Sequence, residues 1–283
     1  KIKKYQFALL IPNNHTNCKI MICLILGDTD FPKKILKSIK KEKIEHFIID
    51  LSKKNIFKKS KNSNRISIGQ FGKMINLMKQ QKCNKVIFAG KIDKPKFSSL
   101  RMDIKGFYYL PKIIKAAKLG DAAIIKVIID ILKYENINVI STTTFSPELS
   151  LKKGNYSRTK PDKNDILDII QGKNYLNKLN ALNHVQGLVV RNGKIIKTET
   201  STGTKKMLLN IKPITNREGI LIKLPKIKQD LRIDLPTIGL DTLVDCLKAG
   251  LKGVVLKHKK NIFLDKNKCI KFANKNKIFI NII

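Results

Sequence analysis

The chain contains no tryptophan, and its aromatic residues amount to only 6% of 283 positions. Its longest uninterrupted apolar run covers the seven residues 20–26. A membrane-spanning helix needs about 20 apolar residues, so we expect no such helix. The hydrophobic fraction of 42% is nevertheless too high for a disordered chain. We therefore expect a globular protein, soluble or peripheral to a membrane, with one large or two smaller domains.

Cysteine and histidine are scarce and scattered. The five cysteines include no C-x-x-C pair and are odd in number, which argues against a disulfide framework or a structural zinc site. The four histidines form no H-E-x-x-H motif, which argues against a zinc hydrolase of that type. We interpret the cysteines as small buried hydrophobic residues in a reducing cytoplasm.

Acidic residues are few: 21 Asp and Glu stand against 58 Lys and Arg, for a net charge of +37. Only six of the basic residues are Arg, which leaves 52 Lys (58 − 6). Lys, Ile and Asn have AT-rich codons, whereas specific phosphate and base recognition relies on Arg. We interpret the charge as a codon-biased, Lys-rich surface that attracts anions in general. The alternative is a basic RNA-binding accessory protein, which would need aromatic stacking surfaces.

The first half of the chain alternates between strand and helix patterns. This alternation predicts βαβ units with a parallel sheet, a Rossmann-like α/β domain over residues 21–150. Residues 1–20 resemble a signal peptide without a cleavage site, and we interpret them as an extension. The expected strands are 20–26, 46–51, 85–89 and 138–142, and the expected helices are 32–43, 69–81, 111–118 and 121–134.

Around 146–164 the chain becomes rich in Pro, Gly and Lys, and we place a linker at 151–164. A second, mixed α/β domain is expected at 165–283. Its clearest signal is Asn192-Gly193 between two apolar runs, which predicts a type I′ hairpin. The expected strands are 187–191, 194–198, 219–224, 253–256, 261–264 and 278–283, with helices at 165–179, 241–249 and before the last strand.

In the first domain, candidate ligand-binding residues follow the expected strands or begin the expected helices. Gly27 ends the first strand, Gly69 and Lys73 begin a helix, and Lys91 and Pro95 follow another strand. In a parallel sheet, ligands bind at the carboxyl ends of the strands, where glycine and lysine suit a phosphate. Ordinary βα turns and solvated lysines are the alternative interpretation.

The densest group of chemical residues is 223–239, Lys-Leu-Pro-Lys-Ile-Lys-Gln-Asp-Leu-Arg-Ile-Asp-Leu-Pro-Thr-Ile-Gly. Asp234 stands between apolar residues and next to Pro236, unlike a solvated surface acid. A desolvated carboxylate near cations suits the orientation of water or the binding of a metal ion. Lys223, Lys226 and Arg232 could balance the charge of a diphosphate. A structural Asp–Arg pair is the alternative.

The octapeptide Arg232-Ile-Asp-Leu-Pro-Thr-Ile-Gly239 resembles the R-V-D-L-P-T-I-G signature of the LpxI-type UDP-2,3-diacylglucosamine pyrophosphatases of lipid A synthesis. The resemblance covers about residues 21–283. Further matches keep the family's order: Gly69-Gln-Phe-Gly-Lys73, Phe88-Ala-Gly-Lys91 with Lys94-Pro95, Leu110-Pro111, Gly120-Asp121, Gln186, Glu199, Gly203-Thr204 and Ala249-Gly-Leu-Lys-Gly253.

The resemblance implies a two-domain α/β hydrolase that cleaves the diphosphate of UDP-2,3-diacylglucosamine into UMP and 2,3-diacylglucosamine 1-phosphate (lipid X). Asp234 would be catalytic, and Asp121, Glu199 and Asp234 would hold a divalent cation, normally Mg²⁺. The residues implied for substrate binding are Gly27, Gly69, Lys73, Lys91, Pro95, Thr204, Lys223, Lys226, Gln229, Arg232 and Thr237.

Three stretches depart from the family pattern. The Gly-rich first loop is reduced to Gly27, although Pro32 remains. Ala122 replaces a second acid after Asp121, and Thr202-Gly-Thr-Lys205 replaces E-G-T-D. A nucleotide-sugar binder with impaired catalysis is therefore a further alternative. The implied partners are the lipid-linked nucleotide sugar and an anionic inner-membrane surface, with no specific nucleic acid. We expect a cytoplasmic protein, peripheral to the inner membrane, and leave a homodimer open.

Overall fold

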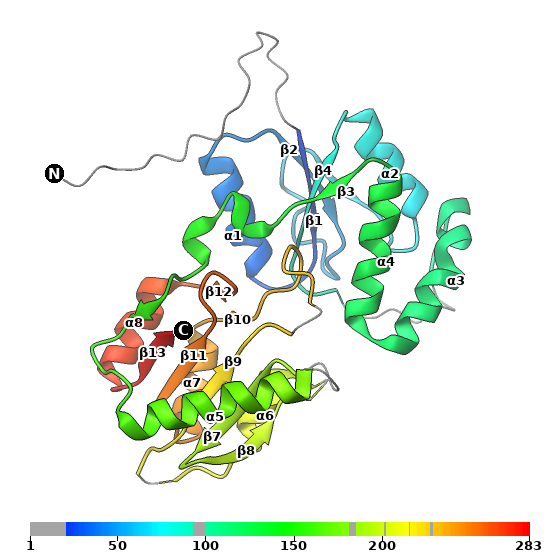
Figure 1. The fold of residues 1–283 in the computed structure, drawn as a ribbon. Helices are drawn as coiled ribbons and strands as arrows, with labels where there is room; N and C mark the ends of the chain where they lie inside the picture. Colours follow the sequence, from blue (N-terminus) through cyan, green and yellow to red (C-terminus); the bar gives the residue numbers. More distant parts are fainter. Residues whose placement is uncertain (1–20, 93–99, 181–184, 201, 215, 227–228) are drawn as a thin grey trace, which may run out of the picture.

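The computed structural model describes residues 21–92, 100–180, 185–200, 202–214, 216–226 and 229–283. The chain forms two lobes, each built around its own β-sheet (Figure 1). The α/β fold class is thus confirmed. The extension expected at 1–20 and the candidate Pro95 lie outside the described residues. Within the described part, no helix combines the length and apolar character that crossing a membrane requires.

Five parallel strands form the sheet of the N-terminal lobe, in the order β3-β2-β1-β4-β5. Doubly wound nucleotide-binding sheets have the same order in their first five strands. The strands are β1 (Ile22–Leu26), β2 (His46–Asp50), β3 (Ser63–Arg65), β4 (Lys85–Ala89) and β5 (Asn138–Val139), and the helices are α1 (Phe31–Lys41), α2 (Phe71–Gln80), α3 (Ile104–Leu119) and α4 (Asp121–Tyr134).

Helices cover both faces of this sheet, which explains why its central strands are apolar throughout. Ile35 and Ile39 of α1 pack in one cluster with Leu24 of β1. On the opposite face, Ile75 of α2 and Ile129 of α4 share another cluster with residues of β1 and β2. Alternate residues of β1 therefore belong to different cores.

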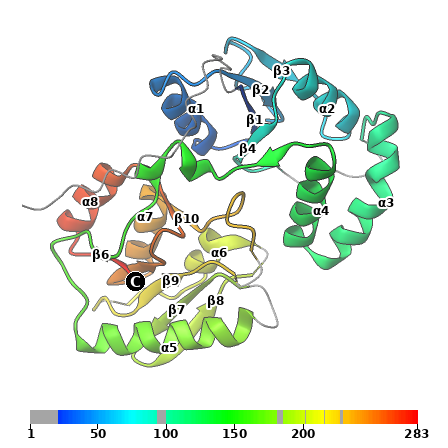
Figure 2. The same cartoon turned by 45° about the horizontal axis from the view of Figure 1, so that its top comes forward.

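The C-terminal lobe contains a mixed six-stranded sheet in the order β6-β13-β11-β9-β7-β8, and a two-stranded sheet of β10 and β12. Helix α5 lies across one face (Figures 1 and 2), and α6, α7 and α8 pack on the other. The elements are β6 (Gly154–Asn155), α5 (Lys163–Asn180), β7 (Gly187–Arg191), β8 (Lys194–Thr198), α6 (Gly203–Leu209), β9 (Ile220–Lys223), β10 (Thr237–Ile238), α7 (Leu240–Lys248), β11 (Gly253–Leu256), β12 (Ile262–Phe263), α8 (Lys266–Lys275) and β13 (Phe279–Ile282).

The loop before β10 rises from the C-terminal lobe and contacts the N-terminal lobe (Figures 1 and 2). Ile233 packs on the α2–α4 side of the first sheet, and Leu235 packs on a cluster that joins the α1 side of that sheet to Ile262 of β12. Asp234 therefore lies at an edge of that sheet. This is the end of the sheet at which the parallel strands have their carboxyl ends. Helix α1 begins there, directly after β1, and its Lys34 forms an ion pair with Asp265 of the C-terminal lobe.

Most of the expected elements are confirmed within a few residues. The hairpin of β7 and β8 has its predicted bounds, and Asn192 and Gly193 have positive φ values of 48° and 74°, as a type I′ turn requires. Helix α4 also has its predicted bounds. The predicted linker 151–164 contributes β6, which pairs with β13.

The predicted start of α3 at Pro111 is wrong, because the helix begins at Ile104 and Pro111 lies inside it. Its N-cap is Asp103, whose carboxylate accepts a hydrogen bond from the Gly106 amide at 2.8 Å. The same carboxylate accepts the amides of Gly72 and Lys73 in the first turn of α2. Burial alone would raise the pKa of Asp103, but these three amides lower it. Asp103 thus joins the starts of two helices.

The contact between these two helix starts leaves no space for a side chain at Gly106. A Cβ atom at this position would lie 2.0 Å from the backbone oxygen of Gly69. Because the atom that it would meet is a backbone oxygen, the segment 69–73 would have to move to accommodate the Cβ.

We predict that Gly106→Ala lowers the free energy of unfolding by about 1–3 kcal/mol, although alanine is the better helix former. Chemical denaturation measures this change, and the exposed Lys115→Ala on the same helix should stay within about 0.5 kcal/mol of the wild type. A Gly106→Ala variant as stable as the wild type would contradict the described contact.

Candidate functional site

Strands β8 and β9 of the C-terminal sheet run in the same direction and bring candidate residues to the same end of the sheet. Both β8 and β9 pair antiparallel with β7, so they end at the same side. Glu199 follows β8, and Lys223 is the last residue of β9. Thr204 lies in the first turn of α6, next to both. The sequence named all three residues as candidates, and the structure brings them together.

Lys223, Thr204 and Glu199 form a chain of hydrogen bonds. The Lys223 ammonium donates to the Thr204 hydroxyl oxygen at 2.8 Å, and that hydroxyl donates to Glu199 Oε1 at 2.7 Å. Lys223 Nζ also lies 3.4 Å from the backbone oxygen of Thr237. Burial lowers the pKa of Lys223, while the charges of Glu199 and Asp234 raise it. Glu199 and Asp234 are thus counter-ions of a buried ammonium group.

A glycine makes room for the Glu199 carboxylate. A Cβ atom on Gly187 would lie 2.8 Å from Glu199 Oε2. That oxygen is buried and has no hydrogen-bond partner among the described residues. No local pattern around Gly187 indicates that it supports the site, because its role depends on a neighbouring strand.

Asp234 is half-buried in the loop between the two lobes. Burial raises the pKa of its carboxyl group, and the charge of Asp121 raises it further. Lys226, the Gln229 amide and Lys223 act in the opposite direction. Asp121 is the first residue of α4, so Asp234 faces the N-terminal lobe. The site therefore combines a destabilised carboxylate with two nearby cations.

Gln229 shapes the loop that carries Asp234. Its side-chain oxygen accepts a hydrogen bond from the backbone amide of Lys226 at 2.8 Å. The backbone amide of Gln229 in turn donates to the backbone oxygen of Lys226 at 3.2 Å. A short turn follows, in which the Asp234 amide donates to the backbone oxygen of Asp230 at 3.0 Å. These bonds place Lys226, Gln229 and Asp234 on one compact segment.

Arg232 is exposed, and its guanidinium group is paired with Asp230. Nη2 lies 2.6 Å from Asp230 Oδ2, and Nε lies 3.0 Å from Oδ1. Hydrogen bonding to Arg232 lowers the pKa of Asp230. The charge of Asp130 in α4 also acts on Arg232, so this side chain faces the N-terminal lobe. The structural Asp–Arg pair considered from the sequence is therefore present, but it involves Asp230 rather than Asp234.

On the opposite side of the interface, Gly27 allows close contact between two loops. A Cβ atom at this position would lie 2.4 Å from the backbone oxygen of Lys91. The Asp28 amide donates to the same oxygen at 2.8 Å, and the Lys91 amide donates to Asp28 O at 3.1 Å. This backbone contact explains the glycine, whereas phosphate binding by Gly27 and Lys91 stays a prediction.

A pocket of about 460 Å³ lies at the carboxyl ends of β1, β2 and β3. Four basic residues and one acid line it together with Ser67 and Gln70: Lys53, Arg65, Lys73, Arg101 and Asp28. Gly69 allows the backbone of Arg101 to approach, since a Cβ would lie 2.8 Å from its oxygen. Of the candidates in the N-terminal lobe, Lys73 therefore lines an anion-attracting pocket.

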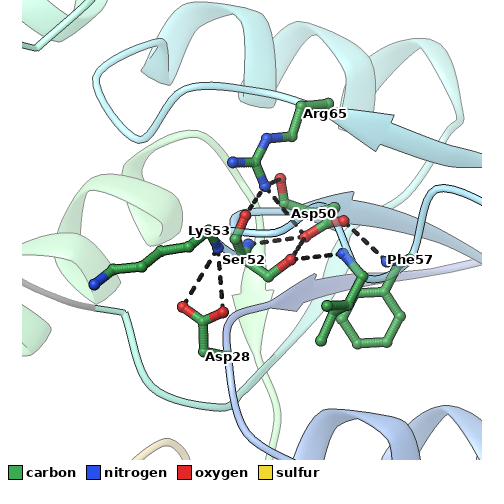
Figure 3. Close-up of polar contacts among 7 residues, drawn as sticks. Asp28, Asp50, Ser52, Lys53, Phe57 and Arg65 are labelled. Carbon is green, nitrogen blue, oxygen red and sulfur yellow. Dashed lines mark hydrogen bonds and ion pairs between the residues drawn. The ribbon is translucent and has the colours of Figure 1, made fainter.

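A buried acid orders the rim of this pocket (Figure 3). Asp50, at the end of β2, is fully buried and accepts hydrogen bonds from the Ser52 amide, the Ser52 hydroxyl and the Phe57 amide. Arg65 donates to the backbone oxygens of Asp50 and Ser52. Asp28 accepts the amide of Lys53 at 3.2 Å. Asp50 thus fixes the loop and does not face the pocket.

Sequence reasoning missed Lys53, Arg65 and Arg101. The rarity of arginine could have revealed two of them, because Arg65 and Arg101 are two of only six in the chain. Lys53 carries no such signal among 52 lysines (58 − 6).

The expected metal ligands are Asp121, Glu199 and Asp234. Within the described residues, no group of three or more His, Cys, Asp or Glu side chains could hold a metal ion. Asp121, Glu199 and Asp234 therefore do not assemble into one three-ligand group. Mg²⁺ often uses only one or two carboxylates and completes its shell with water and substrate phosphates. Asp121 and Asp234, which act on each other electrostatically, fit that mode of binding.

We predict opposite shifts of the Asp234 pKa in two variants of the metal-free protein. Lys226→Gln removes a favourable cation and should raise it, whereas Asp121→Asn removes a repelling carboxylate and should lower it. Titration of the carboxyl-carbon NMR resonances measures both, with Asp230 as an internal control. Shifts in the same direction would contradict this electrostatic arrangement.

Comparison with known proteins identifies the family of the chain. The model of the LpxI N-terminal domain matches residues 21–149, and that of the LpxI C-terminal domain matches residues 152–281. The chain is also 30% identical over 223 residues to the UDP-2,3-diacylglucosamine pyrophosphatase LpxI of Caulobacter vibrioides, which covers 76% of this chain and 80% of the relative. The resemblance inferred from the octapeptide is confirmed: the chain belongs to the LpxI family.

Proposed function

We propose that this protein hydrolyses the diphosphate bond of UDP-2,3-diacylglucosamine to UMP and lipid X. The observation that carries the proposal is the position of Asp234, half-buried between Lys223, Lys226 and the carboxyl ends of the first sheet. The printed activity of the Caulobacter relative supports the same substrate.

The cations would stabilise charge on the diphosphate. Lys223 and Lys226 both act on Asp234, so a phosphoryl group next to the carboxylate would meet two ammonium groups. Thr204 and Glu199 hold Lys223 in place. The nucleotide end would extend toward the basic pocket at Lys73, Arg65 and Arg101. Arg232 could reach a phosphate if its guanidinium group exchanged Asp230 for the substrate.

Asp234 would orient and deprotonate the attacking water. Burial raises the pKa of its carboxyl group, which makes the carboxylate a stronger base than a solvated aspartate. The neighbouring cations keep it ionised at neutral pH. Because Ile233 and Leu235 anchor both sides of Asp234, the carboxylate would be held in one orientation.

A divalent cation would be held by Asp234 and Asp121, together with phosphate oxygens. When bound, it would supply charge neutralisation and a Lewis-acid contact to the diphosphate. Ala122 follows Asp121 in α4, and the exposed Lys205 follows Thr204, so these positions add no acidic ligand.

We predict that Asp234→Asn lowers turnover of UDP-2,3-diacylglucosamine by about 10²–10⁴-fold with little change in substrate affinity. Asparagine keeps the shape of the side chain but cannot accept the proton. Product formation at saturating Mg²⁺ measures turnover, and equilibrium binding measures affinity.

The matched control is Asp241→Asn, an exposed aspartate in the first turn of α7, which should keep wild-type turnover. Treatment of the wild type with EDTA should abolish hydrolysis, and Mg²⁺ should restore it. Substrate binding without hydrolysis by the wild type at any Mg²⁺ concentration would instead identify a nucleotide-sugar binder. Full activity of Asp234→Asn would remove Asp234 from the mechanism.

A further inference from the structure

Helix α3 carries an exposed apolar stripe on its first two turns. Ile104 is 90% exposed, Tyr108 is 70% and Phe107 is 61%, and Pro111 is also exposed. The spacing i, i+3, i+4, i+7 places these four residues on one face of the helix. Large side chains gathered on a protein surface in this way indicate an interaction site.

The stripe is presented by a well-anchored helix. Tyr109, on the opposite face, is buried and packs edge-to-face against Phe71 of α2. Lys105 forms an ion pair with Glu135 at the end of α4, and hydrogen bonding to Lys105 lowers the pKa of Glu135. Together with the N-cap Asp103, these contacts determine which side of α3 packs on the rest of the protein. The apolar stripe therefore faces outward.

The same face continues with three lysines and with Leu119, which is 72% exposed. Lys115 and Lys118 extend the stripe at i+11 and i+14, Lys112 flanks it, and all three are exposed. The sequence of α3 contains no acidic residue. This face therefore combines exposed aromatic and aliphatic side chains with lysines, the residue types of helices that lie in a membrane interface.

We propose that α3 docks the protein on an anionic lipid bilayer, with Ile104, Phe107 and Tyr108 entering the interface and Lys112, Lys115 and Lys118 contacting anionic headgroups. A bilayer satisfies both kinds of side chain on this surface, since it offers apolar depth and negative charge. A second copy of the protein bound through the same face would bring lysines toward lysines without an acidic partner on the helix.

The proposed docking face adjoins a groove that leads toward the basic pocket. Ile104 lines a groove of about 610 Å³ between α2 and α3, and Lys73 and Arg65 line both this groove and the strand-end pocket. This part of the inference rests on the proposed function, because a diacylated substrate would then approach from the side on which the protein meets its membrane. Docking itself does not depend on catalysis.

The test is co-sedimentation of the full chain with phosphatidylcholine vesicles, with or without an equal part of phosphatidylglycerol. The wild type should bind the anionic vesicles, and Phe107→Ser/Tyr108→Ser should bind them about tenfold or more weakly, because two interfacial side chains are lost. Lys112→Gln/Lys115→Gln/Lys118→Gln should bind more weakly and lose its dependence on phosphatidylglycerol. Circular dichroism and thermal melting verify that each variant is folded.

The matched control is Leu167→Ser/Ile170→Ser on α5, which removes two side chains that are 63% and 52% exposed on the other lobe. This variant should bind like the wild type. The proposal is overturned if the wild type binds neither vesicle, if only the α5 variant loses binding, or if the α3 variant binds normally and changes only the oligomeric state. Hydrolysis of substrate in detergent micelles tests the proposed function separately, since no bilayer is present there.

Discussion

The arrangement of the site depends on one packing contact, that of Ile233 from the C-terminal lobe on the α2–α4 side of the first sheet, while Leu235 packs on the cluster that α1 shares with β12. Ile233 ends the turn at 231–233, so the turn itself reaches the end of the first sheet. Asp234 therefore lies half-buried at the carboxyl ends of parallel strands, where α/β proteins bind ligands. The second lobe supplies the acid, and the first supplies the surroundings that bury it.

Burial shifts the pKa values of the two charged groups next to this contact, Asp234 and Lys223. Desolvation raises the pKa of Asp234 and lowers that of Lys223, so it disfavours the charged form of each. The two groups and Glu199 compensate one another, and Thr204 connects Glu199 to Lys223. Removal of one member would leave a buried charge without compensation, which costs far more than a surface ion pair contributes. The network thus links the stability of the loop to the charge that a diphosphate would meet.

The sequence predicted what local patterns determine. Asn192-Gly193 specified the β7–β8 hairpin, and the apolar pattern of 121–134 specified α4. It failed where a long-range contact decides. Pro111 indicated a helix start, but Asp103 caps α3 through amides of two helices. Helix α6 and the two-residue strand β10 are too short to leave a periodic signal. For the site, the octapeptide predicted Asp234 as a candidate, whereas Gly187 and Arg65 act through neighbours that sequence spacing does not reveal.

The most direct test of this account is the turnover of Ile233→Ala compared with that of Ile125→Ala. Both residues are partly buried and pack on the same core of the first sheet, but only Ile233 adjoins Asp234. Both variants should lose similar stability, and Ile233→Ala should lose about 10- to 100-fold in turnover because the carboxylate is no longer held in position. Equal turnover in the two variants would show that seating this loop in the N-terminal lobe does not control catalysis.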